Sequence, residues 1–372
     1  MPRISVIVPI HNGVSFLPAF FDSLICALPD NAELVLVDDG STEAVWEAVP
    51  EFPASCRVTR LSNDVNMGYS AAVNRAFAVA SGEIIVQLNT DLILDRRCIA
   101  AMIKLIEREQ RVGVVGSKLV YPTTGLVQHV GMAFGTHTKT HIYANLAANH
   151  PLCMKTRETQ AVTGATVATT RRVLNLLGPL DEGYFNHNED IEHCLIARNH
   201  GLRNFMCSES VAHHWESQSG PARFAQTKSS EAIFWSRWAA SITVDLDSYI
   251  DEALDDLIAR YPDLDGVSFQ LLDLTRGIDN ALVTGRLIAR WPQLETTARS
   301  YRQMNNPQQR LSIALLLPHW VGAEPVPFIY LVDRHEELEY NALWFASRDR
   351  LVRHELVVDL TGAVIPTSEL RR

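Results

Sequence analysis

The chain has 372 residues, of which 47% are hydrophobic and 20% are charged, as is typical of a globular protein with a sizeable core. The formal net charge is −10, and so acidic a chain lacks the broad basic surface that binding to nucleic acid requires. Nucleic-acid partners are therefore excluded, and an anionic substrate has to be held by local groups. No window approaches the roughly 20 apolar residues of a membrane-spanning helix.

Six cysteines are scattered along the chain without a Cys-x-x-Cys pair or the spacing of a metal site, which predicts reduced thiols in a cytoplasmic protein. The N-terminal stretch MPRISVIVPIHNG is apolar only briefly before Pro9 and lacks a signal-peptide cleavage site, so we interpret it as a strand. The segment 232–242 carries two tryptophans. We interpret it as a core helix, with peripheral contact at the inner face of the membrane as the alternative.

The N-terminal part of the chain alternates between apolar runs, which predict buried strands, and stretches of helical spacing. In chain order these are a strand at 3–10, a helix at 15–28, strands at 32–41 and 56–62, a helix at 68–81 and a strand at 83–91. Such alternation is the signature of a parallel sheet flanked by helices, so we predict an α/β fold. A sheet of this kind binds its ligands beyond the carboxyl ends of the strands.

Polar side chains gather after three of these predicted strands. His11 and Asn12 follow the first strand, Asp38 and Asp39 end the second, and the triplet Asn-Thr-Asp at 89–91 ends the last. At the mouth of a sheet a carboxylate can meet a ligand without the cost of burying an unpaired charge. The pattern therefore predicts a polar ligand site at this edge.

Seven motifs in one order carry a resemblance to a known family. They are VIVPIHNG, LVLVDDGS, NMGYSAAVNRA, VQLNTDL, AVTGATVATTRR, GPLDEGYFNHNEDIEHCLIARNHG and VAHHWESQSG. Up to about residue 240 the chain resembles the family 2 glycosyltransferases of the GT-A fold, in the branch of rhamnosyltransferase-like, O-antigen and polysaccharide enzymes. The resemblance implies a Rossmann-like, mostly parallel sheet. It also implies inverting, metal-dependent transfer of a sugar from a nucleotide diphosphate to a hydroxyl acceptor, a glycan or lipid-linked glycan.

A metal site is implied by the triplet 89–91, which stands where the family has Asp-x-Asp, with Asn first. The resemblance makes Asp91 a ligand of Mn²⁺ or Mg²⁺, an ion that would neutralise the leaving diphosphate. The stretch AHHWESQS matches the family's second ligand position, with His214 as the better match and His213 as the fallback. A helix cap at Asp91 and surface histidines are the structural alternatives.

The catalytic base is implied by the stretch 186–201, which reads as a helix with Asn188 as N-cap and Gly201 as its stop. A helix N-terminus favours ionised carboxylates. The resemblance implies Asp190 as the base and Glu189 as a group that orients acceptor or base. The alternative is that both acids only complement the helix dipole.

A set of donor-binding positions follows from the same resemblance. These are Pro9, His11, Asn12, Asp38, Asp39, Asn66, Gly68, Asn74, Asn89 and Gly164. Asp38 would bond the base of a UDP- or dTDP-sugar, and Asp39 would brace its loop. Asn74 would support the ribose or would be an ordinary polar residue on a helix face.

We expect three parts in the chain: a GT-A domain at 1–242, a helical linker at 243–310 and a small strand-rich appendage at 311–372. The appendage has strand-like stretches at 311–318, 326–333, 338–347 and 354–366. Within the first part, the segment 121–163 has little periodicity. We interpret it as a flap over the donor. A metal site at its His137 and His141 is the weaker interpretation.

Two other functional classes remain open. A sugar-1-phosphate nucleotidyltransferase would share the sheet and the metal, but it would carry a Gly-rich basic loop near the N-terminus, which VPIHNGVSF lacks. A catalytically silent module of the same fold would bind a nucleotide without turnover. Replacement of Asp190 separates a glycosyltransferase from these two classes, because a glycosyltransferase would lose turnover and keep its nucleotide affinity.

Overall fold

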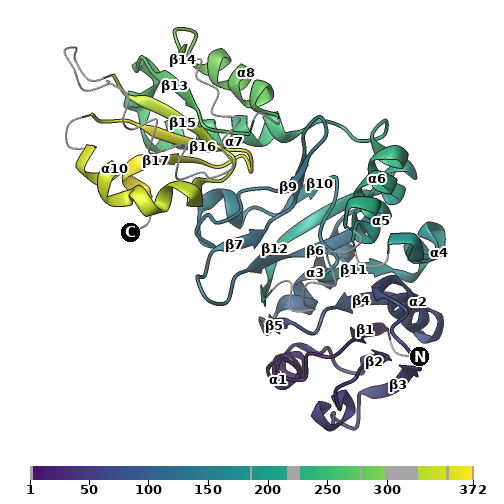
Figure 1. Cartoon of the computed structure of the whole chain (residues 1–372). Helices are drawn as coiled ribbons and strands as arrows, with labels where there is room; N and C mark the ends of the chain where they lie inside the picture. Colours follow the sequence, from purple (N-terminus) through teal and green to yellow (C-terminus); the bar gives the residue numbers. More distant parts are fainter. Residues whose placement is uncertain are drawn as a thin grey trace. The chain divides into compact units, whose positions relative to one another are not determined.

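The computed structural model describes residues 3–184, 187–215, 227–276, 279–297, 326–348 and 352–370. By its internal contacts the chain divides into two compact units. The first unit comprises residues 1–132 and 146–242, and the second comprises 133–145 and 243–372. Each unit is built around its own sheet (Figure 1).

The N-terminal half of the first sheet is parallel throughout. Its elements are β1 (Ile4–Ile10), α1 (Leu17–Ala27), β2 (Glu33–Asp39), β3 (Arg57–Asn63), α2 (Tyr69–Val79) and β4 (Ile84–Leu88). The strands lie in the order β3, β2, β1, β4. All six elements predicted between residues 3 and 91 are present, so this part of the prediction is confirmed.

The other half of the first sheet mixes strand directions. Its elements are β5 (Leu92–Leu94), α3 (Cys98–Arg108), β6 (Val112–Val120), β7 (Val127–His129), β10 (Arg157–Thr159), β11 (Thr166–Thr170), α4 (Arg171–Leu177), α5 (Glu189–Asn199), β12 (Arg203–His214) and α6 (Thr227–Trp238). β11 lies between β4 and β6, antiparallel to both, and β12 runs parallel to β6. The predicted α/β class is confirmed, with β11 as the strand that interrupts the parallel run.

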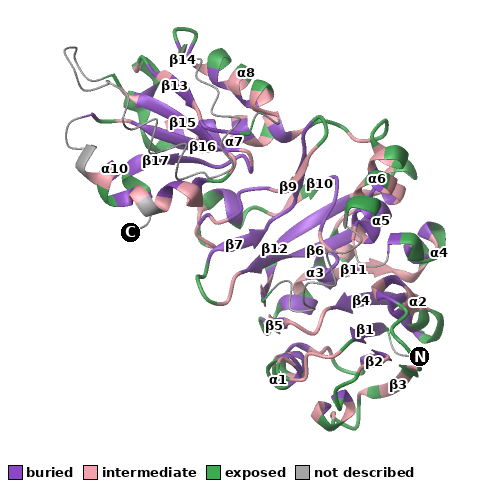
Figure 2. Cartoon of the chain, viewed as in Figure 1, coloured by how far each residue is buried: buried purple, intermediate pink, exposed green. Residues whose placement is uncertain are grey.

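Apolar side chains cover both faces of the parallel strands. Phe20 and Phe21 of α1 pack on one face, and Val73 of α2 packs on the other against Ile7. Figure 2 shows β1, β2 and β4 as buried, while the helices around them have exposed outer sides. Burial on both faces explains why these strands are continuous apolar runs without alternation.

The second unit has a five-stranded sheet of its own. Its elements are the hairpin β8 (Met132–Phe134) and β9 (Lys139–His141), then α7 (Leu246–Arg260), β13 (Gln270–Asp273), α8 (Asn280–Arg290), β14 (Glu295–Thr297), β15 (Phe328–Val332), η6 (His335–Asn341), α10 (Ala342–Arg348), β16 (Leu356–Asp359) and β17 (Val364–Pro366). The order is β14, β13, β15, β16, β17, and only β17 is antiparallel. We expected a helical linker and a separate appendage, whereas β13 from the first region pairs with β15 from the second.

Two local predictions in this region have different outcomes. The stretch 338–347, expected as a strand, is helical, and its Leu338, Ala342 and Phe345 pack into one core at helical spacing. The strand prediction was therefore wrong, because a short apolar run does not reveal its period. The predicted strand at 311–318 lies outside the described residues.

The segment 133–145, which we expected to form part of a flap, belongs to the second unit. The Asp245 carboxylate accepts a hydrogen bond from the backbone N–H of Phe134 at 2.8 Å. The Tyr143 hydroxyl donates to the backbone oxygen of Tyr249 at 2.9 Å. Both partners lie far away in the sequence. Local periodicity therefore could not predict that the segment 133–145 belongs to the second unit.

The helix α6 contains the two tryptophans whose role was left open. Trp235 Nε1 donates to Glu231, and Trp238 Nε1 donates to Glu192 at 2.8 Å. Phe234 is fully buried. These contacts pack α6 against its unit, but among its described side chains only Ser230 and Phe234 are buried, so α6 is a surface helix rather than the core helix that we expected. Across the described part of the chain, every helix is too short or too polar to cross a bilayer. All six cysteines are free thiols, as predicted.

Candidate active site

The two predicted metal ligands meet where β5 runs beside the end of β12. His214 is paired with Leu92, which brings it next to Asp91. Its Nε2 lies 3.2 Å from Asp91 Oδ1, and both side chains are largely buried. Successive side chains of a strand point to opposite faces, so His213 points away from this pair. The geometry joins Asp91 to His214 rather than to the fallback His213.

Gln128 on β7 fixes the orientation of the His214 ring. His214 Nδ1 lies 2.6 Å from Gln128 Oε1, and Gln128 Nε2 lies 3.5 Å from the backbone oxygen of His214. Because an amide oxygen only accepts, Nδ1 carries the proton, and in the neutral ring Nε2 presents a lone pair toward Asp91. Buried partners of this kind orient metal-binding histidines. The donor set therefore fits a divalent cation.

A second candidate ion site lies in the second unit. Within the described ranges, only His335, Glu336 and Asp359 form a group of three ligands close enough to share an ion. Asp359 is fully buried, and its two oxygens accept hydrogen bonds from His335, Thr361 and Ala363. Burial lowers the pKa of His335, but the hydrogen bond and charge of Asp359 outweigh burial and raise it. Since these bonds use the lone pairs that an ion needs, we interpret the group as a structural ion pair.

Asp190 stands in the first turn of α5, as predicted. Its Oδ2 accepts from the backbone N–H of Gly164 at 2.6 Å, and its Oδ1 accepts from that of Ile191 at 2.7 Å. A Cβ on residue 164 would lie 2.9 Å from the Cβ of Asp190, so only glycine allows this approach. Gly201 follows the helix at φ +72°, as a stop signal should. Asn188 holds the N-cap position, but its side chain makes no capping bond.

Tyr69, the first residue of α2, connects the triplet to the loop that holds Asp190. Its hydroxyl donates to Asn89 Oδ1 at 2.8 Å and accepts from Gln87 Nε2 at 2.7 Å. Gln87 Nε2 also donates to the backbone oxygen of Gly164 at 3.1 Å. A continuous polar network therefore runs between the two predicted parts of the site.

The charge around Tyr69 shows how closely the carboxylates gather. Burial raises the pKa of the Tyr69 phenol well above its usual range, and the negative charges of Glu189, Asp190 and Asp91 raise it further. The phenol therefore stays protonated and acts as a donor. Sequence reasoning missed Tyr69, although its position directly after Gly68 at a helix start was a usable signal.

The first two loops form a connected rim beside this network. His11 Nδ1 donates to the backbone oxygen of Asp39 at 2.9 Å, and its Nε2 accepts from Asn66 Nδ2 at 3.0 Å. The Asp39 carboxylate accepts from the backbone N–H groups of Met67 and Gly68, each at 2.9 Å. Asp39 thus braces the neighbouring loop before α2, whereas we had expected it to brace its own loop. Gly68 has φ +93°, a conformation that favours glycine.

Asn12 and Asp38 belong to the same rim. Asn12 Oδ1 accepts from the backbone N–H of Thr42 at 2.8 Å, and Asp38 Oδ1 accepts from that of Ser41 at 2.9 Å. Pro9 is buried within β1, and Asp38, at the end of β2, is also buried, at 9% exposure. A base can therefore meet His11 and Asn12 but not the Pro9 ring.

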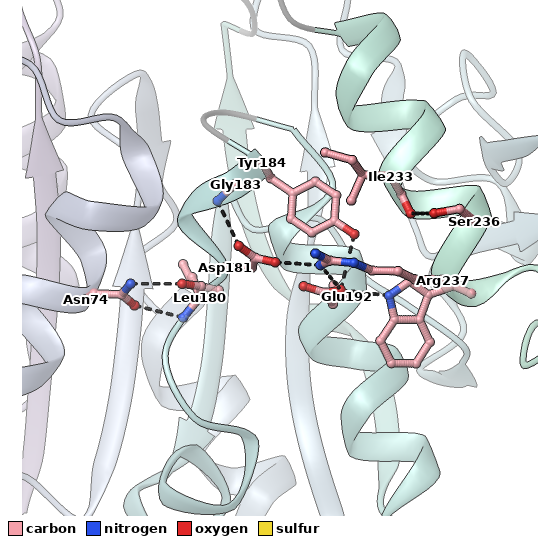
Figure 3. Close-up of polar contacts among 10 residues, drawn as sticks. Asn74, Leu180, Asp181, Gly183, Tyr184, Glu192, Ile233, Ser236 and Arg237 are labelled. Atoms are coloured by element: carbon pink, nitrogen blue, oxygen red, sulfur yellow. Dashed lines mark hydrogen bonds and ion pairs between the residues drawn. The ribbon is translucent and has the colours of Figure 1, made fainter.

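Asn74 is not brought into this group. Its amide exchanges two hydrogen bonds with the backbone of Leu180, at 2.9 and 2.8 Å (Figure 3). The predicted ribose contact therefore needs correction: both polar atoms of Asn74 anchor the turn before α5. The alternative, an ordinary polar residue on a helix face, was closer to what the structure shows. Neither interpretation predicted the contact with Leu180, because Leu180 lies far from Asn74 in the sequence.

Comparison with known proteins places these observations in a family. Residues 5–165 match the model described as glycosyl transferase family 2. The O-antigen biosynthesis protein RfbC of Myxococcus xanthus is 31% identical over 248 residues, covering 64% of this chain and 19% of that protein. The uncharacterized protein y4gI of Sinorhizobium fredii is 32% identical over 228 residues, covering 59% and 25%. The chain thus spans a quarter or less of the length of these relatives.

The comparison with solved structures also finds similar chains. The mannosyltransferase PcManGT from Pyrobaculum calidifontis, solved with GDP-Man and Mn²⁺, has a TM-score of 0.49 and 17% sequence identity. The similarity covers 86% of this chain and 82% of that one. The region that matches the family model contains the parallel strands β1 to β4, the triplet 89–91 and Gly164. Residues 5–165 of this chain therefore form a region that matches glycosyl transferase family 2.

Proposed function

We propose that the chain is an inverting, metal-dependent GT-A glycosyltransferase. It transfers a sugar from a nucleotide diphosphate donor to a hydroxyl of a glycan or lipid-linked glycan, in polysaccharide or glycoconjugate assembly. The observation that carries the proposal is the 3.2 Å approach of His214 to Asp91 at the carboxyl edge of the sheet. A relative named for O-antigen biosynthesis supports the proposed pathway class.

The ligand pair accounts for departure of the nucleotide. Mn²⁺ or Mg²⁺ held by Asp91 and His214 would neutralise the charge that develops on the leaving diphosphate. Gln128 selects the tautomer of the neutral His214 ring, because its oxygen accepts the Nδ1 proton and leaves Nε2 as the nitrogen that can bind an ion. An imidazole beside a carboxylate suits Mn²⁺ at least as well as Mg²⁺, which prefers oxygen ligands.

Asp190 accounts for activation of the acceptor. A carboxylate has about four lone-pair sites, and the bonds from Gly164 and Ile191 use one on each oxygen. The remaining sites can take the proton of the attacking hydroxyl. Because two backbone groups hold the carboxylate, it is oriented before the acceptor arrives. Glu189 precedes it on α5 and orients acceptor or base.

The rim of His11, Asn12 and Asp38 receives the base of the donor. His11 and Asn12 are held by the backbone of the neighbouring loop and Asp38 by that of its own loop, so the rim has a definite shape. Asn66 and Gly68 close the rim on the side of α2. We propose a UDP- or dTDP-sugar, whose pyrimidine base presents amide-like groups to Asp38.

A screen of nucleotide-sugar donors, with and without Mn²⁺, tests the function. We expect one donor to raise the melting temperature and to be consumed with release of nucleoside diphosphate, in a metal-dependent way. Proton NMR of the product should show an inverted anomeric centre. Asp190→Asn should lose turnover and keep donor affinity. Release of pyrophosphate from a sugar-1-phosphate and a nucleoside triphosphate would instead establish a nucleotidyltransferase.

A further inference from the structure

Glu192 is a buried carboxylate that the proposed mechanism does not use. It lies two residues after Asp190 on α5 and is 5% exposed. Residues two apart on a helix point to different sides. Asp190 faces Gly164, and Glu192 instead faces α6 and the turn that precedes α5.

Three donors converge on one oxygen of Glu192. Its Oε1 accepts from Trp238 Nε1 at 2.8 Å, and from the Arg237 guanidinium and the Tyr184 hydroxyl at 3.2 Å each (Figure 3). Burial and the charge of Glu192 raise the pKa of Tyr184, so the phenol remains a donor. A carboxylate buried to this extent is stable only when it is paired and hydrogen-bonded, so loss of these donors would release it from its place.

Arg237 extends the contact to the turn before α5. Its guanidinium also bonds Asp181, whose other oxygen accepts from the backbone N–H of Gly183 at 2.7 Å (Figure 3). The same guanidinium lies over the ring of Tyr184, 5.5 Å from its centroid. One side chain of α6 therefore holds both the turn at 181–184 and α5.

A second contact from α6 lies on the other side of Asp190. Glu231 Oε1 accepts from His187 Nε2 at 3.1 Å and from Asn188 Nδ2 at 3.3 Å. Asn188 has φ +81°, so α5 begins abruptly at a left-handed residue. Side chains of α6 therefore bind α5 and the residues before it on both sides of the proposed base. Glu231 binds the residues before Glu189, and Arg237 and Trp238 bind Glu192.

We propose that Glu192 is a positioning residue for Asp190, acting through its bonds to Arg237 and Trp238. This inference rests on the proposed function, since it assigns a role in the same reaction. The α6 contacts fix where the first turn of α5 stands, and with it the direction of the Asp190 carboxylate. Glu192 itself has no part in donor binding.

Two variants of graded severity test the positioning role. Glu192→Gln keeps an accepting oxygen but loses the charge that holds Arg237, and Trp238→Phe removes one donor while keeping an aromatic ring. We expect kcat to fall about tenfold or more in Glu192→Gln, because small misplacements of a catalytic group are costly, while KM and Kd for the donor change less than about twofold. Amide exchange of the peptide 187–193 should become faster in both variants.

Glu33→Gln is the matched control. Glu33 is 1% exposed and also accepts several hydrogen bonds, from Ser5 and Ser81, but it begins β2 at the opposite edge of the sheet. The Glu33→Gln variant should lower the melting temperature about as much as Glu192→Gln does. It should leave kcat and the amide exchange of residues 187–193 unchanged.

The outcomes separate the two hypotheses. An unchanged kcat in Glu192→Gln, or an equal loss in Glu33→Gln, would overturn the positioning role. If the wild type consumed no sugar nucleotide, the proposed function would fail, and the exchange measurement would still decide whether Glu192 holds α5. Unchanged exchange of 187–193 in both variants would then refute the inference on its own.

Discussion

At the scale of single residues, the Tyr69 hydroxyl links the triplet at 89–91 to the residues around Gly164. It supplies a donor to Asn89 and an acceptor to Gln87, both within a buried network. Tyr69→Phe leaves these two amides without that partner, which costs about 1–3 kcal/mol of stability when the group is buried. We expect denaturant unfolding to show this loss, together with a lower kcat.

The same substitution makes a prediction about pH. Because burial and three nearby carboxylates raise the pKa of Tyr69, the phenol does not ionise near neutrality. The ratio of wild-type to Tyr69→Phe activity should therefore be constant between about pH 6 and pH 9, below the ordinary phenol pKa of about 10. A ratio that changed near pH 8 would mean that Tyr69 titrates during turnover.

Gln128 and His213 form an informative pair for the metal site. Gln128→Met removes the partner that orients His214 while keeping similar volume, and we expect Mn²⁺ affinity to fall by about 10- to 100-fold. His213→Ala, on the opposite face of β12, should leave that affinity unchanged. Calorimetric titration with Mn²⁺ in the presence of the donor nucleotide measures both. Equal losses would place His213 among the ligands.

At the scale of elements, one substitution should have opposite signs at two glycines. Gly201 follows α5 at φ +72°, and Gly285 lies inside α8; neither has an atom near the place of an added Cβ. Gly201→Ala should destabilise by about 1 kcal/mol through backbone strain. Gly285→Ala should stabilise by about 0.5–1 kcal/mol through helix propensity. Amide hydrogen exchange measures both effects: it should become faster within α5 in Gly201→Ala and slower within α8 in Gly285→Ala.

The elements also show what sequence could and could not predict. Strands β1, β2 and β4 were predictable because burial on both faces leaves an uninterrupted apolar run. The closeness of Asp91 and His214 was implied by the family resemblance. Gln128 could not be found, because its role depends on which strand lies beside β12. The helix at 342–348 was misread because few residues carry its period.

At the scale of the whole molecule, residue 242 does not cleanly separate the two units. The segment 133–145 belongs to the second unit, and its Phe134 and Tyr143 are fully buried. A chain ending at residue 242 would lose Asp245 and Tyr249, which are hydrogen-bond partners of these two residues. We expect it to melt lower than the full chain and to self-associate, as exposed apolar patches do. Light scattering and calorimetry would detect both effects.

A companion variant isolates the cause. Replacing residues 134–144 by a short Gly-Ser linker in the shortened chain should restore monodispersity, since no orphaned apolar segment remains. If the shortened chain were monomeric and equally stable without that replacement, the segment would not depend on the second unit.

The excursion at 133–145 also constrains how the protein is made. Its partners from Thr243 onward leave the ribosome roughly 100 residues later, which at about 5–20 residues per second is a delay of several seconds. During that interval the apolar residues of the β8–β9 hairpin have no partners from the second unit, although the rest of the first unit has been synthesised. A chaperone that binds exposed apolar segments of nascent chains would bind there, and slowing translation between codons 146 and 242 should prolong that binding.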